Sequence, residues 1–231
     1  FEEKTTGTPI GFAIHNTNRI KMPLKDKKII KIKKGDAILH YSLLTDENDF
    51  KGVVLLENEI DTINSFNSIK RKSEFYTIRS LRNKSCKGQA IEYTDFGAPF
   101  LKESELKISI SHNKYFGVLA QAEHAIACDI EEIKSKTLKL ASRFAREEEL
   151  AMWEKVGPEE VTIIWTIKES LFKLCDRKGI DFKKDLQITG KKKDTYTCRF
   201  LAKDSWKGVD MVIQKIENNI LCFNPKSIYE S

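Results

Sequence analysis

The sequence of 231 residues predicts an α+β fold, and two observations lead to this prediction. Extended runs with alternating apolar residues, and helical runs with apolar residues three and four positions apart, occur in both halves of the chain. Short polar turns separate these runs, and the sequence contains no low-complexity linker. We therefore expect two α+β halves, residues 1–120 and 121–231, which pack closely at a seam near residues 115–125.

The N-terminal half is expected to combine short strands with one long helix. Residues 11–17 (GFAIHNT) and 28–34 (KIIKIKK) have the pattern of extended segments. Apolar side chains recur at helical spacing around residues 63–84, which predicts a helix there. Two further extended runs, QAIEY and LKISIS, flank a turn-rich loop that contains FGAP at residues 96–99.

The C-terminal half is expected to open with a hairpin over residues 116–131 (FGVLAQAEHAIACDIE). Two helices are predicted to follow, near residues 137–155 and 159–177. The remainder alternates between strands and turns: LQIT, TYTCRFLA and VDMVIQKI are the strands, and GKKKD, DSWKG and ENN are the turns.

Composition excludes several classes of protein. A hydrophobic content of 40% with 32% charged residues is typical of a globular chain. No apolar stretch is long enough to span a membrane, and the first residues have no signal-peptide pattern, so we expect a cytoplasmic protein without a membrane partner. The five cysteines form no C-x-x-C pair and are expected to be buried thiols, and the four histidines lack metal-ligand spacing.

The formal net charge is +6, and the excess is mostly lysine. Lysines gather in residues 19–36 and 190–194, and those at positions 31, 33 and 34 alternate with apolar residues as on the solvated edge of a strand. Such a basic surface also suits a phosphate-rich ligand, an acidic protein or nucleic acid. Composition alone does not choose among these readings.

The stretch WTIKESLFK, residues 165–173, places two charges inside an apolar run. On a helix, Lys168 falls within the apolar arc, whereas Glu169 and Lys173 flank its edge next to Trp165. Taken alone, this is an ordinary core helix in which Lys168 lays its stem along apolar surface and Glu169 pairs with Lys173. A functional interpretation needs support from other segments.

The stretch ACDIEEI, residues 127–133, brings two acids together. In a strand, Asp129 and Glu131 share one face with Cα atoms only ~7 Å apart. Carboxylates at that spacing repel one another unless a cation compensates, and Mg²⁺ prefers such oxygen ligands. The alternative is a strand end at which both acids are solvated.

The stretch ISISHN, residues 108–113, ends a strand with a hydroxyl, an imidazole and an amide. These groups can hold a phosphate through hydrogen bonds. A Ser111–His112 nucleophile pair is a rival interpretation, but adjacent strand residues point apart, and no G-x-S-x-G context is present. A simple polar turn is the third interpretation.

Five segments in order resemble one family. FGAP, ISISH, CDIEE, RFAREEEL and WTIKESLFK, within residues 96–173, are similar to the motifs of the 4′-phosphopantetheinyl transferases, in particular of the surfactin-synthetase-activator (Sfp-like) branch. That branch has a G-K-P loop, a strand ending in Ser-His, a G-I-D-I-E strand, an F-x-x-x-E helix start and W-x-x-K-E-[AS]-x-x-K. Upstream, KRKSEFYTIRSL resembles the family's R-R-x-E-x-x-x-x-R-x-x-L helix.

The resemblance implies roles at the reacting phosphates. Asp129, Glu131 and Glu169 would hold Mg²⁺ against the pyrophosphate of coenzyme A. Glu169 would also be the general base for the incoming serine hydroxyl, and Lys168 and Lys173 would neutralise phosphate charge.

It also implies contacts with the nucleotide end of coenzyme A. Ser111 and His112 would contact its phosphates, with Arg79 assisting at the 3′-phosphate. Gly97 and Pro99 would shape a loop against adenine.

Phe144 and Glu148 match the F-x-x-x-E pair, whose helix is expected to support the site. The chain departs from the family pattern at three places. Ala98 stands where Lys is usual, Ala127-Cys128 replaces Gly-Ile, and Asn113 follows the histidine where Ser is frequent. These changes remove a charge, alter packing and remove a hydroxyl, respectively, but none removes an implied metal ligand.

The function implied is transfer of 4′-phosphopantetheine from coenzyme A to a serine of an acidic acyl or peptidyl carrier protein, with release of 3′,5′-ADP. Because the chain is about twice as long as expected for the short, trimeric branch of the family, the resemblance implies a monomer whose two similar α+β halves pack as a pseudo-dimer with the active site at their seam. Which fatty-acid, polyketide or peptide-synthetase carrier is modified stays open. A non-catalytic protein that binds RNA or another polyanion and a Mg²⁺-dependent nucleotide phosphohydrolase are the alternatives; the preferred reading has no nucleic-acid partner.

Overall fold

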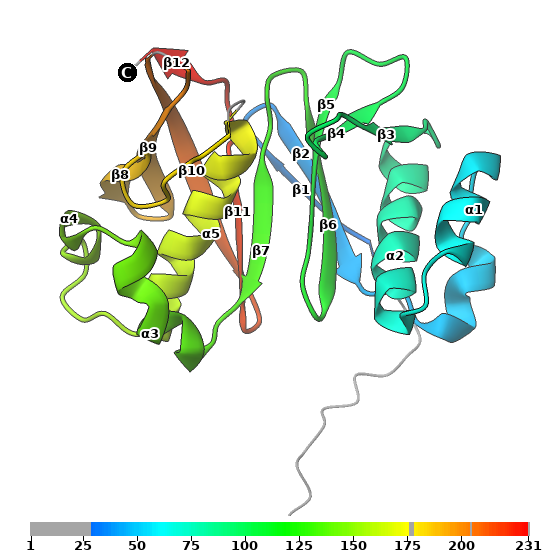
Figure 1. The fold of residues 1–231 in the computed structure, drawn as a ribbon, viewed down its shortest axis with the longest axis horizontal. Helices are drawn as coiled ribbons and strands as arrows, with labels where there is room; N and C mark the ends of the chain where they lie inside the picture. The colour runs from blue at the N-terminus through cyan, green and yellow to red at the C-terminus, as the bar shows by residue number, and fades with distance from the viewer. Residues whose placement is uncertain (1–28, 176–177, 204, 231) are drawn as a thin grey trace, which may run out of the picture.

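The computed structural model describes residues 29–175, 178–203 and 205–230. It has a mixed α+β architecture, as predicted, with two antiparallel sheets that lie side by side and a long helix packed on each (Figure 1). The extended segment predicted at residues 11–17 and the lysines of residues 19–28 lie outside the described residues. The similarity of the two halves and their boundary at residue 120 stay predictions.

Within the described residues, six strands form the first sheet in the order β1-β2-β6-β5-β4-β3. Their bounds are β1 (Ile30–Lys34), β2 (Ala37–Leu43), β3 (Ile91–Tyr93), β4 (Pro99–Leu101), β5 (Lys107–His112) and β6 (Phe116–Ala122). The 3₁₀ helix η1 (Glu47–Gly52) and the helices α1 (Glu57–Asn64) and α2 (Ile69–Ser85) accompany this sheet.

The helix predicted at residues 63–84 is shorter at its start. The chain breaks between α1 and α2 over SFNS, where short polar side chains compete for backbone hydrogen bonds. Ser65 donates to the Thr62 carbonyl, and Ser68 accepts from the Arg71 amide to begin α2. Helix α2 then packs closely on β6, since a Cβ at Gly117 would lie 2.7 Å from the Thr77 methyl carbon.

In the described part of the C-terminal half, the second sheet has the order β7-β11-β10-β9-β8, and β12 also pairs with β10. The bounds are β7 (Cys128–Glu132), β8 (Leu186–Lys192), β9 (Thr195–Leu201), β10 (Trp206–Ile216), β11 (Asn219–Phe223) and β12 (Tyr229–Glu230). Helix α5 (Pro158–Leu174) packs against β7, β11 and β8, and α3 (Ser135–Phe144) packs on α5.

The single helix predicted at residues 137–155 is wrong. Helix α3 ends at Phe144, and a separate short helix α4 (Glu147–Leu150) follows. The interruption has a tertiary cause: the Glu149 carboxylate accepts from the Arg146 amide at the start of α4 and from the Ile188 amide of β8. The apolar periodicity of residues 137–155 does not indicate the contact with Ile188, which lies 39 residues from Glu149.

The hairpin predicted over residues 116–131 is also wrong. Strand β6 pairs with β2 and β5, whereas β7 pairs with β11 in the other sheet. On the other edge of β7, the backbone amides donate to serine hydroxyls of β5 and not to backbone carbonyls. The amide of Cys128 lies 3.0 Å from Ser109 Oγ, and that of Ile130 lies 3.3 Å from Ser111 Oγ. The chain therefore crosses from one sheet to the other between β6 and β7.

One apolar core is shared by both halves at this crossing. It joins residues of β2, β6, β7, β10 and β11, including Leu39, Val118, Ile130, Val212 and Phe223. The predicted close packing of the halves is thus present.

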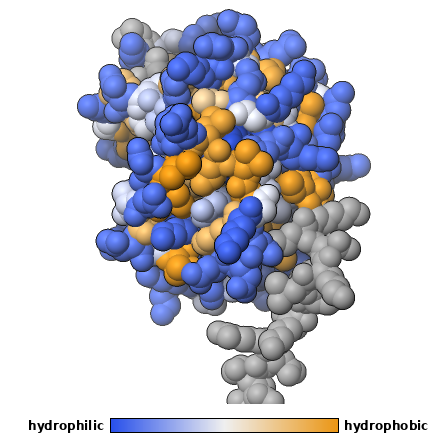
Figure 2. All heavy atoms as spheres, turned by 90° about the vertical axis from the view of Figure 1, so that its right-hand side faces the viewer, coloured by the Kyte–Doolittle hydropathy of each residue, from blue (hydrophilic) through white to orange (hydrophobic). Residues whose placement is uncertain are grey.

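A different face of the molecule carries exposed apolar side chains. Figure 2 shows an apolar patch on the side that bears η1 and α1, where Val54 and Ile60 are exposed. None of the helices within the described ranges combines the length and apolarity that a membrane crossing requires.

Candidate active site

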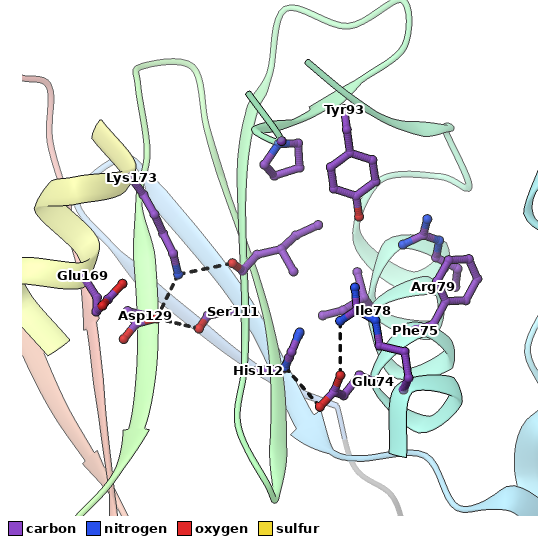
Figure 3. Close-up of a pocket in the computed structure, with 14 residues that line it drawn as sticks. Glu74, Phe75, Ile78, Arg79, Tyr93, Ser111, His112, Asp129, Glu169 and Lys173 are labelled. Carbon is purple, nitrogen blue, oxygen red and sulfur yellow. Dashed lines mark hydrogen bonds and ion pairs between the residues drawn. The ribbon is translucent and has the colours of Figure 1, made fainter. Parts of the chain in front are cut away.

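A pocket of about 360 Å³ lies at the seam between the two sheets (Figure 3). Its walls come from α2, the β3–β4 hairpin, β5, β7 and α5: Arg71, Glu74, Phe75, Ile78, Arg79, Tyr93, Gly97, Pro99, Ile110, Ser111, His112, Asp129, Glu169 and Lys173. Eight of the ten residues predicted from the sequence are in this lining, and Glu131 and Lys168 are not. Segments far apart in the chain thus meet in one cavity.

Asp129 lies at the centre of the seam. Its Oδ1 accepts from Ser111 Oγ and from Lys173 Nζ, each at 2.8 Å. Its Oδ2 is buried and accepts no hydrogen bond from the described residues. Because a buried acceptor without a donor is costly, this oxygen suits a cation or a donor brought by a ligand.

Lys173 connects three elements of the site. From α5, its Nζ reaches Asp129 and the Cys128 carbonyl at 2.8 Å on β7, and the Ile110 carbonyl at 3.4 Å on β5. Burial is the largest single influence on the pKa of Lys173 and lowers it, but the charge and hydrogen bond of Asp129, together with Cys128 and Glu169, raise the pKa overall. Lys173 therefore stays an ammonium at the pocket wall.

Glu169 and Glu131 face the same region from α5 and β7. Burial, followed by the charge of Asp129, raises the pKa of Glu169 to about 7. The same two causes raise the pKa of Glu131, whose Oε1 accepts from the indole Nε1 of Trp165 at 3.2 Å. Three carboxylates thus share a partly buried region with Lys173.

The acids at the seam are of the type that binds an oxygen-ligated cation. In the described ranges, no group of three His, Cys, Asp or Glu side chains is arranged to hold a metal ion as it stands. Nevertheless, Oδ2 of Asp129 has no hydrogen-bond partner among the described residues, and burial, followed by the charge of Asp129, raises the pKa of Glu169 and Glu131. The residues fit Mg²⁺ in their chemistry, with Asp129 as the anchor.

The other end of the pocket carries positive charge. Arg79 donates through Nε to Glu59 at 2.6 Å, and its guanidinium carbon lies 3.9 Å from the ring centroid of Phe75. Arg82 donates to the same Glu59 oxygen at 2.8 Å. Two guanidinium groups share one carboxylate, so a positive charge remains near the pocket for an anion.

The FGAP loop keeps its turn without the lysine usual in the family. Gly97 has φ of +79°, which favours glycine, and its amide donates to the Thr94 carbonyl at 2.8 Å. The Thr94 hydroxyl oxygen also accepts from the Ala98 amide at 3.1 Å. Local backbone contacts therefore hold the loop at the edge of the pocket.

Lys168 was expected to neutralise phosphate charge, but its side chain is buried away from the pocket. Its ammonium is fully buried, 2.9 Å from Glu149, and donates to the carbonyls of Phe182 at 2.9 Å and Leu186 at 2.7 Å. All three donors of the ammonium are used inside the C-terminal half. The helix-supporting acid is likewise Glu149, not Glu148, whose side chain is exposed.

Ser111 and His112 turn to different partners. The Ser111 hydroxyl binds Asp129 and the Ile130 amide, whereas Nδ1 of His112 lies 3.5 Å from Glu74. The nucleophile-pair interpretation is therefore unsupported. The sequence reading missed Glu74, although it matches the acid of the R-R-x-E helix.

Part of the chain matches a known protein family. Residues 125–221, less than half of the chain, match the family model described as the 4′-phosphopantetheinyl transferase superfamily. The matched segment begins just before β7 and ends within β11, and it contains Asp129, Glu131, Glu169 and Lys173. No curated protein matches the chain.

Proposed function

We propose that this protein transfers 4′-phosphopantetheine from coenzyme A to a serine hydroxyl of an apo acyl or peptidyl carrier protein. The serine oxygen bonds to the phosphorus that carries pantetheine, the pyrophosphate bond to that phosphorus breaks, and 3′,5′-ADP leaves. The observation that carries this proposal is the junction of Asp129, Glu169 and Lys173 within a matched superfamily segment, at the end of a pocket that carries Arg79 and His112.

Glu169 is suited to take the proton of the serine. A general base acts best when its pKa lies near the working pH, and the pKa of Glu169 is raised to about 7. Asp129, Glu131 and Glu169 would hold Mg²⁺, which neutralises pyrophosphate charge when bound. Lys173 adds a fixed positive charge beside them.

The positive end of the pocket would bind the nucleotide part of coenzyme A. Arg79, oriented by Glu59 and Phe75, and His112 supply donors for phosphate. The Ser111 hydroxyl is already engaged with Asp129, so it supports the phosphate site through that carboxylate. Gly97 and Pro99 form the edge at which adenine would lie.

The basic surface suits an acidic carrier protein, since the formal net charge of the chain is +6. We propose a monomer of the surfactin-synthetase-activator branch, because FGAP and ISISH precede the matched segment in the order of that branch. Buried thiols at Cys86, Cys128, Cys198 and Cys222 suit a reducing cytoplasm.

Intact mass spectrometry of an apo carrier protein tests the proposal. After incubation with coenzyme A, Mg²⁺ and this chain, the carrier should gain the mass of one phosphopantetheinyl group. The matched control Asp129→Asn keeps the side-chain shape and should give no gain within the same time. Nucleotide product without a modified carrier would indicate a phosphohydrolase, and neither product would indicate a polyanion-binding protein.

A further inference from the structure

A buried acid lies in the part of the pocket that otherwise suits an anion. Glu74 of α2 is only 6% exposed and lines the pocket together with Arg71, Arg79 and His112. A carboxylate there repels a phosphate, and its own burial is costly unless other groups compensate. Its presence calls for a physical reason.

Its contacts supply that reason. Glu74 Oε1 lies 3.5 Å from Nδ1 of His112 on β5 and 3.6 Å from Nζ of Lys70, and Oε2 accepts from Arg71 at 3.3 Å. The 3.5 Å contact with His112 is longer than a short hydrogen bond, and it is an ion pair when the imidazole is protonated. Glu74 therefore joins two cations of α2 to the imidazole at the end of β5.

The orientation of the imidazole follows from this contact. With Nδ1 facing Glu74, the other ring nitrogen points into the pocket, as Figure 3 shows. A proton held on Nδ1 by the carboxylate fixes the tautomer, and a second proton makes Nε2 a donor toward an anionic oxygen. The geometry needed for phosphate binding thus depends on Glu74.

Electrostatics act in the same direction. Burial lowers the pKa of His112, and Arg71, Lys173 and Lys70 act with burial, whereas Glu74 is the neighbour that opposes them. Without Glu74, cations from α2 and α5 would face the imidazole with no compensating charge. Loss of Glu74 would therefore disfavour the imidazolium, the form in which Nε2 donates to a phosphate while Nδ1 keeps its proton.

We infer that Glu74 is a positioning residue, which aims Nε2 of His112 and the guanidinium of Arg71 at the phosphates of the nucleotide end. This inference rests on the proposed function for the identity of the ligand. It needs only nucleotide binding, not transfer to a carrier.

The test is calorimetric binding of 3′,5′-ADP to Glu74→Gln. General electrostatics predicts that removing a carboxylate strengthens the binding of an anion. Positioning predicts the opposite: affinity falls about tenfold, as for loss of a charged hydrogen bond, whereas the affinity for adenosine, which carries no phosphate, is unchanged. Glu92→Gln, which breaks the surface pair with Lys102, is the control with the same charge change.

The ring ¹⁵N shifts of His112, assigned with His112→Gln, provide a second measurement that a purely structural role would not alter. Wild type should show the proton on Nδ1, and Glu74→Gln a mixture of tautomers. Unchanged shifts together with equal or tighter binding of 3′,5′-ADP would overturn the inference. If Glu74→Gln does not fold, the ring ¹⁵N shifts of His112 are measured in the wild-type complex with 3′,5′-ADP. An unprotonated Nδ1 in that complex would also overturn the inference.

The two proposals fail separately. A wild-type protein that modifies no carrier but binds 3′,5′-ADP in a Glu74-dependent manner refutes the transferase and retains this inference. Normal transfer with no dependence on Glu74 does the reverse.

Discussion

Lys168 lies on α5, five residues before Lys173, and its burial in the C-terminal half indicates that its loss acts on stability. Lys168→Met keeps a long apolar side chain but removes the ammonium. The Glu149 carboxylate then remains fully buried with its charge uncompensated, and the carbonyls of Phe182 and Leu186 lose a donor. The variant should therefore be destabilised.

The magnitude follows from burial. Removing one partner of a buried ion pair typically costs ~3–5 kcal/mol of the free energy of unfolding. In a protein of this size each 1 kcal/mol lowers Tm by about 2–4 °C, which gives a fall of roughly 6–20 °C. Exposed Lys139→Met on α3 makes the same chemical change and should leave Tm within about 2 °C.

Thermal unfolding, followed by circular dichroism, should be measured with carrier modification on the same samples. The double variant Lys168→Met/Glu149→Gln should recover part of the lost stability, because it removes the uncompensated charge. At a temperature at which Lys168→Met is folded, nucleotide binding should be near that of wild type. A wild-type Tm with loss of 3′,5′-ADP binding would refute the burial argument and restore the phosphate role.

The remaining predictions concern the pocket. Glu169→Gln should lower the rate of carrier modification by ~10²–10⁴-fold with little change in Tm, measured at saturating coenzyme A; full activity would exclude Glu169 as the base. In wild type, the affinity for Mg²⁺ should rise with pH through about 7 as Glu169 of the metal-free protein loses its proton. The sign for stability is opposite: because the pKa of Glu169 is about 7 in the folded state and 4.5 ordinarily, its contribution is full below pH 4.5 and lost as pH rises through 7. Tm of Glu169→Gln should show a weaker pH dependence over that range, and an identical profile would contradict the raised pKa. Carrier modification should slow as salt rises, since exposed charges are screened within ~10 Å at 0.1 M, and a salt-independent kcat/KM would argue against steering by the basic surface.

Local sequence signals predicted those elements whose ends depend on nearby residues. Helix α5 was expected at residues 159–177 and runs from Pro158 to Leu174. Proline at its first position suits a helix start, and the Gly157 amide donates to Glu160 to close the first turn. On β7, the predicted alternation is present: Cys128 and Ile130 enter the shared core, while Asp129 faces the pocket.

The incorrect predictions depend on distant partners. The segment between β6 and β7 is tied to Asn224, which accepts from the Ala127 amide and donates to the Ala125 carbonyl. That contact spans 97 residues for Ala127 and is invisible to any local pattern. A strand–turn–strand pattern alone does not say whether the two strands pair with each other or with strands elsewhere.

Lys168 shows the same limit within the site. The helical arc correctly placed it among apolar residues, but its partner was hidden because Glu149 lies on another helix, next to the motif position Glu148. Motif spacing identified pocket residues such as Glu169 and Lys173, which flank the apolar face of α5. It did not separate a lysine that faces phosphate from one that neutralises a buried acid.

The hydrogen bonds that join the two sheets also set the charge of the candidate active site. The Ser111 hydroxyl accepts from the Ile130 amide at the edge of β7 and donates to Asp129, and Lys173 reaches carbonyls of both β5 and β7 as well as Asp129. Asp129 is therefore held by one residue from each half of the molecule. Among the described residues, Oδ2 of Asp129 has no partner, so the hydrogen bonds of the seam leave this acceptor for a ligand. The position of that acceptor depends on how the halves pack, so a change that shifts the seam should alter the candidate active site even without touching the pocket.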